Sequence, residues 1–180
     1  MKATGIVRRI DDLGRVVIPK EIRRVLRIRD GDPLEIYTAG DGEVIFKKYS
    51  PIGELSSTAA QYAEAMIKHT NSPVIICDRD HCVAAAGVTR REVLERRVAP
   101  ALEELIESRS SFVYDDPKKK PIAALEGFDR KAAVAVPIIS SGDLSGAVVL
   151  LLSDTGALPD ETDIKLTRVA AAFLGKQMEE

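Results

Sequence analysis

Four arginines near the N-terminus have the chemistry to bind a polyanion: Arg8, Arg15, Arg23 and Arg24. A guanidinium group is planar and always charged, and its paired donors suit phosphate oxygens as well as the O6 and N7 atoms of guanine. Residues 1–29 hold nine lysines and arginines against three acidic residues, whereas the whole chain has a net charge of -2. Because a cationic cluster gains affinity by releasing the counterions of a phosphate backbone, this pattern predicts a nucleic-acid partner.

Four further basic residues are secondary candidates for the same contacts: Lys2, Arg9, Lys20 and Arg27. For Arg27 the alternative is an ion pair with an acid such as Asp30. Any one of these residues could simply solvate a small domain, but their clustering favours DNA binding. Aromatic residues make up only 4% of the chain and Trp is absent, so base stacking on single strands is poorly supported. We therefore expect the partner to be double-stranded DNA.

The elements that must position these side chains are short. Residues 6–10 and 15–18 are β-branched runs around a turn at 11–14, which predicts two strands joined as a hairpin. Pro19 suits the first turn of a helix, and residues 20–28 carry apolar positions at helical spacing on one face, with basic residues opposite.

A second hairpin is predicted over residues 34–37 and 43–47, which alternate cleanly around a Gly-rich turn. About 50 residues with four short strands seldom bury enough apolar surface to fold alone. No disulfide or metal motif supports them, so we expect this region to pair with a second copy of the chain.

The run from Met1 to Arg24 closely resembles the AbrB family of transition-state regulators, and the match extends over nearly all of residues 1–50. The resemblance implies a mainly β swapped-hairpin barrel formed by two intertwined chains, with the four arginines facing DNA. A second helix at the spacing of a helix-turn-helix is missing, so we expect sequence-tolerant readout, through groove shape and backbone contacts on A·T-rich DNA.

From Glu54 onward the pattern changes to longer helices and strongly apolar strands. Turn formers such as 140–143 separate the strands, and Pro-Asp-Glu at 159–161 is a helix start. The predicted elements are a helix at 54–69, strands at 73–78 and 82–87, helical pieces at 90–97 and 100–108, strands at 111–114, 132–139 and 144–152, and a helix at 160–178.

This second region resembles a GAF domain, through Val136-Pro137-Ile138 and the Gly-x-Val-x-Leu run at 146–150. The resemblance implies an α+β fold with a central antiparallel sheet flanked by helices, and a small-ligand pocket roofed by residues 87–128. The family's signature for cyclic nucleotides is absent, so the ligand class and any cofactor stay unassigned. The alternative is a pocket that has lost its ligand.

Two cysteines and two histidines could be written as zinc ligands: Cys77, Cys82, His69 and His81. Their spacing matches no structural zinc pattern, so we expect the two cysteines to be small buried apolar residues and predict no metal site. No base is placed to activate a thiol, and we expect no catalytic residues and no enzyme activity.

The predicted organisation is an AbrB-like DNA-binding domain at 1–50, a linker at 51–53 and a GAF-like sensor and oligomerisation domain at 54–180. Two contacts between chains, one through 1–50 and one through helices 54–69 and 160–178, would give a tetramer. We expect a cytoplasmic, membrane-independent transcription regulator of sporulation. The alternatives are an antitoxin-type module and a metabolite-sensing scaffold whose DNA binding is incidental.

Overall fold

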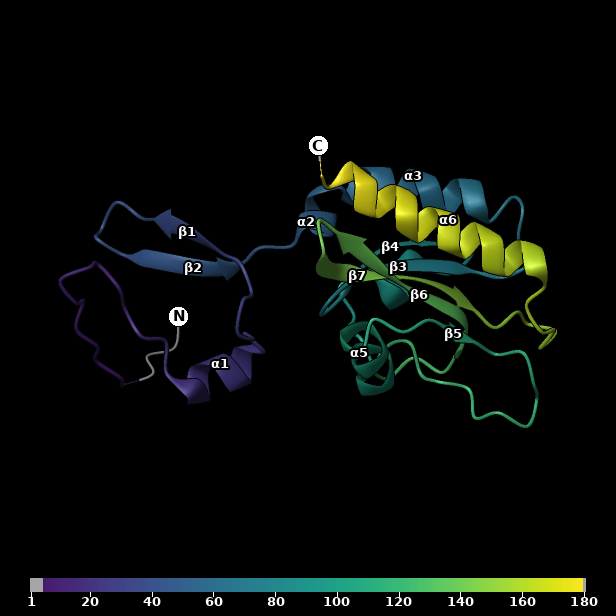
Figure 1. The fold of residues 1–180 in the computed structure, drawn as a ribbon, viewed down its shortest axis with the longest axis horizontal. Helices are drawn as coiled ribbons and strands as arrows, with labels where there is room; N and C mark the ends of the chain where they lie inside the picture. The colour runs from purple at the N-terminus through teal and green to yellow at the C-terminus, as the bar shows by residue number, and fades with distance from the viewer. Residues whose placement is uncertain (1–4, 180) are drawn as a thin grey trace. The chain divides into compact units, whose positions relative to one another are not determined.

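The computed structural model describes residues 5–179, and the chain divides into two compact units, residues 1–49 and 50–180 (Figure 1). The boundary follows the change in sequence pattern that precedes Glu54. No helix in the described part of the chain is long and apolar enough to cross a membrane.

The first unit contains helix α1 (Lys20–Leu26) and an antiparallel hairpin of β1 (Leu34–Thr38) and β2 (Val44–Lys48). Pro19 directly precedes the helix, and Arg27 ends it in the left-handed conformation, with φ of 52°. The three elements confirm the helix and the second hairpin predicted from the sequence.

Residues 5–18 form no strand, so the strands predicted at 6–10 and 15–18 are not present in this single chain. The turn between them is formed: Gly14 N–H donates to the Asp11 carbonyl at 3.1 Å, and Asp11 N–H donates to the Arg15 carbonyl at 3.1 Å. A strand needs a neighbouring strand to satisfy its backbone groups, and no strand of the described part of the chain pairs with these segments.

Many apolar side chains of the first unit are exposed. Among its described residues only Pro19 is buried, while Val7 is 89% exposed and Ile36 is 62% exposed. Cross-strand partners share a face of a hairpin, so Ile36 and Phe46 lie on one face of β1–β2, and this face is open. The unit has the apolar residues of a core but no core within one chain.

The second unit is a five-stranded antiparallel sheet with helices on both faces. The strand order is β4-β3-β7-β6-β5, so the three most apolar predicted strands lie in the middle, as expected for strands buried on both faces. Its elements are α2 (Pro51–Glu54), α3 (Ser56–Met66), β3 (Val74–Asp78), β4 (Cys82–Ala86), α4 (Arg90–Val93), α5 (Pro100–Glu107), β5 (Phe112–Val113), β6 (Ala132–Ser140), β7 (Asp143–Leu151) and α6 (Glu161–Gln177).

Each face of the sheet has its own apolar core. On one face α3 and α6 lie side by side (Figure 1), and Leu174 of α6 belongs to the same buried cluster as Ile76 and Val148 of the sheet. On the other face α5 and the loops around it cover a second cluster that includes Leu102 and Val149. The sheet is therefore buried on both faces, and the surface loops of this unit connect the elements that pack on it.

Residues 51–53, the predicted linker, form helix α2 together with Glu54. The Ser50 hydroxyl caps this helix by accepting a hydrogen bond from Gly53 N–H at 3.1 Å, and Ile52 is fully buried in the core beneath α3 and α6. The same hydroxyl donates to the Asp78 carboxylate at 2.9 Å. The start of the second unit is thus attached to the end of strand β3.

Gly146 in β7 allows a close approach of the neighbouring strand's backbone. A Cβ atom at this position would lie 1.9 Å from the Cys77 carbonyl oxygen, so Gly146→Ala would force two central strands apart. We expect this substitution to lower the free energy of unfolding of the second unit by about 3 kcal/mol, the upper end of the range for overpacking. Urea denaturation measures the change.

Gly142→Ala is the matched control for that substitution. Gly142 has φ of 86° but open space around its Cβ position, so alanine there costs only backbone strain of about 1 kcal/mol. Equal losses for the two variants would contradict a steric role for Gly146.

Candidate nucleic-acid interface and sensor cleft

The structure distributes the predicted DNA-binding residues over three segments of the first unit. Arg8 and Arg9 lie in the extended segment before the turn, and both side chains are exposed. Arg15 follows the turn, and the remaining candidates lie on or beside α1. Lys2 lies outside the described residues.

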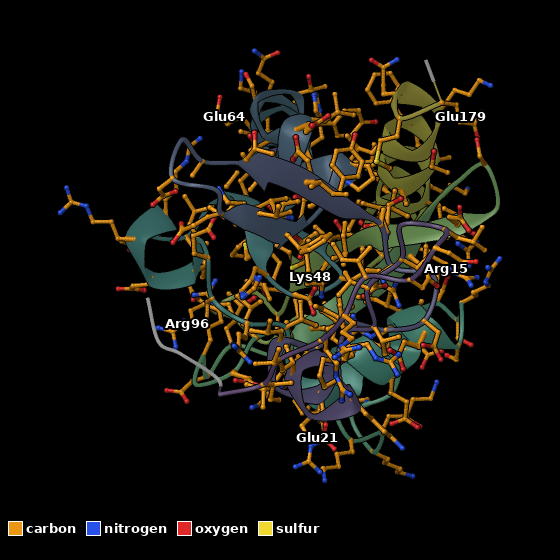
Figure 2. All side chains as sticks on the ribbon, turned by 90° about the vertical axis from the view of Figure 1, so that its left-hand side faces the viewer. Arg15, Glu21, Lys48, Glu64, Arg96 and Glu179 are labelled. Carbon is orange, nitrogen blue, oxygen red and sulfur yellow. The ribbon has the colours of Figure 1, made fainter. Side chains whose placement is uncertain are left out.

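Arg15 is held by the turn that precedes it (Figure 2). The Asp11 carboxylate accepts hydrogen bonds from the Arg15 backbone N–H at 2.7 Å and from Arg15 Nε at 2.8 Å. These two bonds lower the pKa of Asp11, the backbone bond contributing most. The Arg15 side chain is still 70% exposed, and the guanidinium nitrogens beyond Nε have no partner among the described residues. Asp11 therefore orients Arg15 while leaving its outer edge open to a ligand.

Helix α1 presents a cationic surface, with no buried residue along its length. Lys20 and Arg24 are exposed, whereas Arg23 donates to the Asp30 carboxylate. Asp30, the acid considered as a partner for Arg27, is thus bonded to Arg23. Asp30 is 95% exposed, and such surface ion pairs are weak enough, at about 0–1 kcal/mol, to be exchanged for a phosphate.

Arg27 has a structural role in addition to its charge. Its left-handed backbone ends α1, and its carbonyl accepts a hydrogen bond from Lys48 Nζ at 2.9 Å. This bond connects the end of α1 to strand β2. The side chains that the structure leaves most available for an anion are those of Arg8, Arg9, Arg15, Lys20 and Arg24.

A cleft of about 830 Å³ opens beside the edge strand β4 of the second unit. Two segments line it, residues 87–96 and 127–130. Both fall close to the predicted pocket roof at 87–128. Sequence reasoning named no residue within the cleft, although the Glu92–Arg96 spacing of four residues was a signal that could have been used. The lining residues are Gly87, Val88, Thr89, Glu92, Arg96, Gly127, Phe128, Asp129 and Arg130.

The two cysteines lie in the core of the second unit. Cys77 and Cys82 are partners in the register of β3 and β4, and both are free thiols with no exposed surface, as expected from the sequence. A hydrogen bond with Cys82, followed by burial, raises the pKa of Cys77 well above its usual range. A protonated, buried thiol is unreactive. No three His, Cys, Asp or Glu residues in the described part of the chain could together hold a metal ion.

Both units have relatives among known proteins. Residues 54–179 match the family described as "Stage V sporulation protein T C-terminal, transcription factor", and residues 7–53 match the family described as "Antidote-toxin recognition MazE, bacterial antitoxin". Transition state regulatory protein AbrB of Bacillus subtilis (strain 168) is 61% identical over 51 residues, which are 28% of this chain and 52% of that protein.

Solved structures show the fold of the second unit. The GAF domain of a phosphoenolpyruvate-protein phosphotransferase from Coxiella burnetii is 17% identical, with a TM-score of 0.50 over 67% of this chain and 80% of that one. Residues 122 to 287 of a methyl-accepting chemotaxis protein are 17% identical, with a TM-score of 0.53 over 68% of this chain and 87% of that one.

These features define the class: a two-unit protein in which an AbrB-like N-terminal unit is followed by a GAF fold. Stage V sporulation protein T of Bacillus subtilis (strain 168) is 48% identical over 180 residues, covering all of both chains. The chain belongs to the stage V sporulation protein T family.

Proposed function

We propose that this protein is a DNA-binding transcription regulator of sporulation, with no catalytic activity, that uses residues 1–50 to bind double-stranded DNA and residues 54–180 to oligomerise and sense a small ligand. One observation carries the proposal. The first unit exposes both its guanidinium groups and the apolar residues of an incomplete core, so pairing two chains would complete the core and gather the charges.

Pairing also explains the missing strands. In a swapped-hairpin barrel, residues 6–10 and 15–18 of one chain would find their hydrogen-bonding neighbours on the other chain. Eight arginines, four from each protomer, would then form one broad cationic surface: Arg8, Arg15, Arg23 and Arg24, with Lys2, Arg9, Lys20 and Arg27 at its margins. Such a surface binds the phosphate backbone of a duplex and tolerates many sequences.

The proposed DNA contact is tested by titrating the full-length protein into a fluorescent A·T-rich duplex and following anisotropy at two salt concentrations. Saturable binding that weakens steeply with salt supports it, because each neutralised phosphate releases counterions. Absence of binding at the lower salt concentration would overturn it.

The outer face of α3 and α6 is the proposed second contact between chains. Tyr62 of α3 stacks on Phe173 of α6 with ring centroids 5.2 Å apart, yet Phe173 stays 40% exposed and Val169 stays 57% exposed. Apolar residues that continue a buried stripe onto an open helix face are suited to a helical bundle between protomers. If this face and the first unit join different pairs of chains, a tetramer forms.

Phe173→Glu is expected to convert this tetramer into a dimer, because a charge would be placed in the apolar contact. Light scattering during gel filtration would show the molar mass fall to about half. Leu94→Glu is the matched control, since Leu94 is a similarly exposed apolar residue outside α3 and α6. An unchanged mass for Phe173→Glu would exclude this face as the contact.

Ligand binding in the second unit would change DNA binding by altering the spacing of the DNA-binding units. A ligand that favours one conformation of the second unit shifts the population toward it and so changes the spacing of two DNA-binding units. The hydrogen bond from Ser50 to Asp78 supports such a route, because it connects the start of the second unit to the end of strand β3.

A further inference from the structure

The cleft beside β4 contains an arginine that is fixed in place without being neutralised. Arg96, which is labelled in Figure 2, donates from Nε to the Glu92 carbonyl at 2.7 Å and from Nη1 to the carbonyls of Glu126 at 3.0 Å and Gly127 at 2.8 Å. All three acceptors are neutral. Nη2 donates to no described residue, so the guanidinium keeps its full charge and one free edge.

The backbone around Arg96 is equally well held. The Arg96 carbonyl accepts from Cys82 N–H at 3.0 Å, and Glu95 N–H donates to the Cys82 carbonyl at 2.9 Å. Arg96 is thereby attached to the edge strand β4. Gly127 has φ of 63°, and a Cβ atom there would lie 3.1 Å from Arg96 Nη1, so a side chain would crowd the guanidinium. An arginine restrained in this way loses little conformational freedom when it binds an anion.

The rest of the cleft carries the opposite charge and an apolar surface. Glu92 and Asp129 line it, and neither carboxylate accepts a hydrogen bond from a described residue. Arg130 also lines it, but its guanidinium is paired with Asp154. Val88 and Phe128, both partly buried, supply apolar surface. The cleft therefore offers one unneutralised cation, two free carboxylates and an aromatic ring.

We propose that this cleft binds a small amphoteric molecule of the α-amino-acid class. Its carboxylate would pair with Arg96, its ammonium group with Glu92 and Asp129, and its side chain would lie against Val88 and Phe128. Two carboxylates repel a polyphosphate, which disfavours nucleotides. The inference rests on the proposed sensing function and names the ligand class for that function.

The test uses the full-length protein and isothermal titration calorimetry with each of the twenty proteinogenic L-amino acids, one at a time, and with ATP. We expect at least one amino acid to bind, and its analogues lacking either the carboxylate or the amine to bind at least about tenfold more weakly, since each loses a charge-assisted hydrogen bond. Binding of none of the twenty, or tighter binding of ATP, would overturn the proposal.

Two variants separate the roles of the charges. The double variant Glu92→Gln, Asp129→Asn neutralises two carboxylates that make no hydrogen bond or ion pair with a described residue, so it should fold normally. It should bind the amino acid at least about tenfold more weakly, whereas its affinity for the anionic, amine-free analogue should not fall, because the repulsion from the two carboxylates is removed. Arg96→Gln should weaken both ligands. Arg109→Gln is the matched control for Arg96→Gln, and Glu104→Gln removes one carboxylate outside the cleft.

A loss of affinity in the controls equal to that in the cleft variants would contradict the assignment. DNA binding, measured in parallel by anisotropy, keeps this test distinct from that of the proposed function. Normal DNA binding with no amino-acid binding would reject only the ligand class, whereas amino-acid binding without DNA binding would reject the DNA-binding function.

Discussion

A chain in which Arg8, Arg15, Arg23 and Arg24 are all replaced by alanine is expected to bind duplex DNA at least a hundredfold more weakly, on the order expected from removing several charge-assisted contacts. In a dimer the change removes eight guanidinium groups from one surface. If six to ten phosphates are neutralised, the slope of log K against log salt should be roughly -5 to -9, and most of this dependence should disappear in the variant.

Fluorescence anisotropy at several salt concentrations measures both effects. The matched control replaces four exposed basic residues of the second unit with alanine: Arg91, Arg97, Arg109 and Lys118. It makes the same change in net charge, so it should alter affinity only through the weak overall field of the protein. If both quadruple variants bind alike, the arginines of the first unit are not the DNA-binding surface.

The second large effect is expected from Ile36→Asp. Ile36 pairs with Phe46 on the open apolar face of the β1–β2 hairpin, the face that a second chain would cover. A carboxylate buried there without a partner would cost about 3 kcal/mol or more, which raises the dimer dissociation constant at least about a hundredfold. Because the first unit lacks a core of its own, we expect it to unfold and DNA binding to be lost as well.

Analytical ultracentrifugation and circular dichroism of the full-length protein report the assembly and the fold. Ile36→Val keeps the apolar surface and should remain paired. Glu35→Asp places the same new side chain on the opposite face of the hairpin and should also have little effect. A variant Ile36→Asp that still pairs and binds DNA normally would show that this face is not the contact between chains.

The two outcomes are linked, because in this protein the DNA-binding surface and the pairing surface belong to the same 50 residues. The quadruple arginine variant should lose DNA binding but keep the molar mass of the assembled protein. The Ile36→Asp variant should lose DNA binding and also the contact between chains, so its molar mass should fall. Comparing the two therefore separates the chemistry of DNA recognition from the assembly that positions it.

The second unit was largely predictable from the sequence. Continuous apolar runs such as 144–152, bounded by turn formers, gave strands whose positions in the structure differ by a residue or so. The final helix was also predicted, and the structure shows its start in detail: Asp160 caps the helix through Asp163 N–H at 2.9 Å. Short-range sequence patterns are enough to predict a strand that is buried on both faces and a helix that begins with a capping residue.

The predicted strands at 6–10 and 15–18 show where local signals fail. Their β-branched residues favour extended backbone, but a strand forms only beside another strand, and no described strand of the single chain pairs with these segments. The helix predicted at 54–69 spans Ser56–Met66 in the structure, and Glu54 belongs instead to a separate turn of helix, α2, which Ser50 caps. The β-propensity of residues 6–10 and 15–18 therefore favours an extended backbone, but it does not specify the strand with which each segment pairs.

The sequence by itself determined the segregation of charge, the arginines of the first unit and the strands of the sheet, since each depends on residue type and short spacing. Only the tertiary structure decided the contacts between distant segments. Arg96 meets the carbonyls of Glu126 and Gly127, thirty or so residues away, and Gly146 admits the backbone of Cys77. No local pattern encodes such pairings, because they arise when the sheet brings separate segments into register.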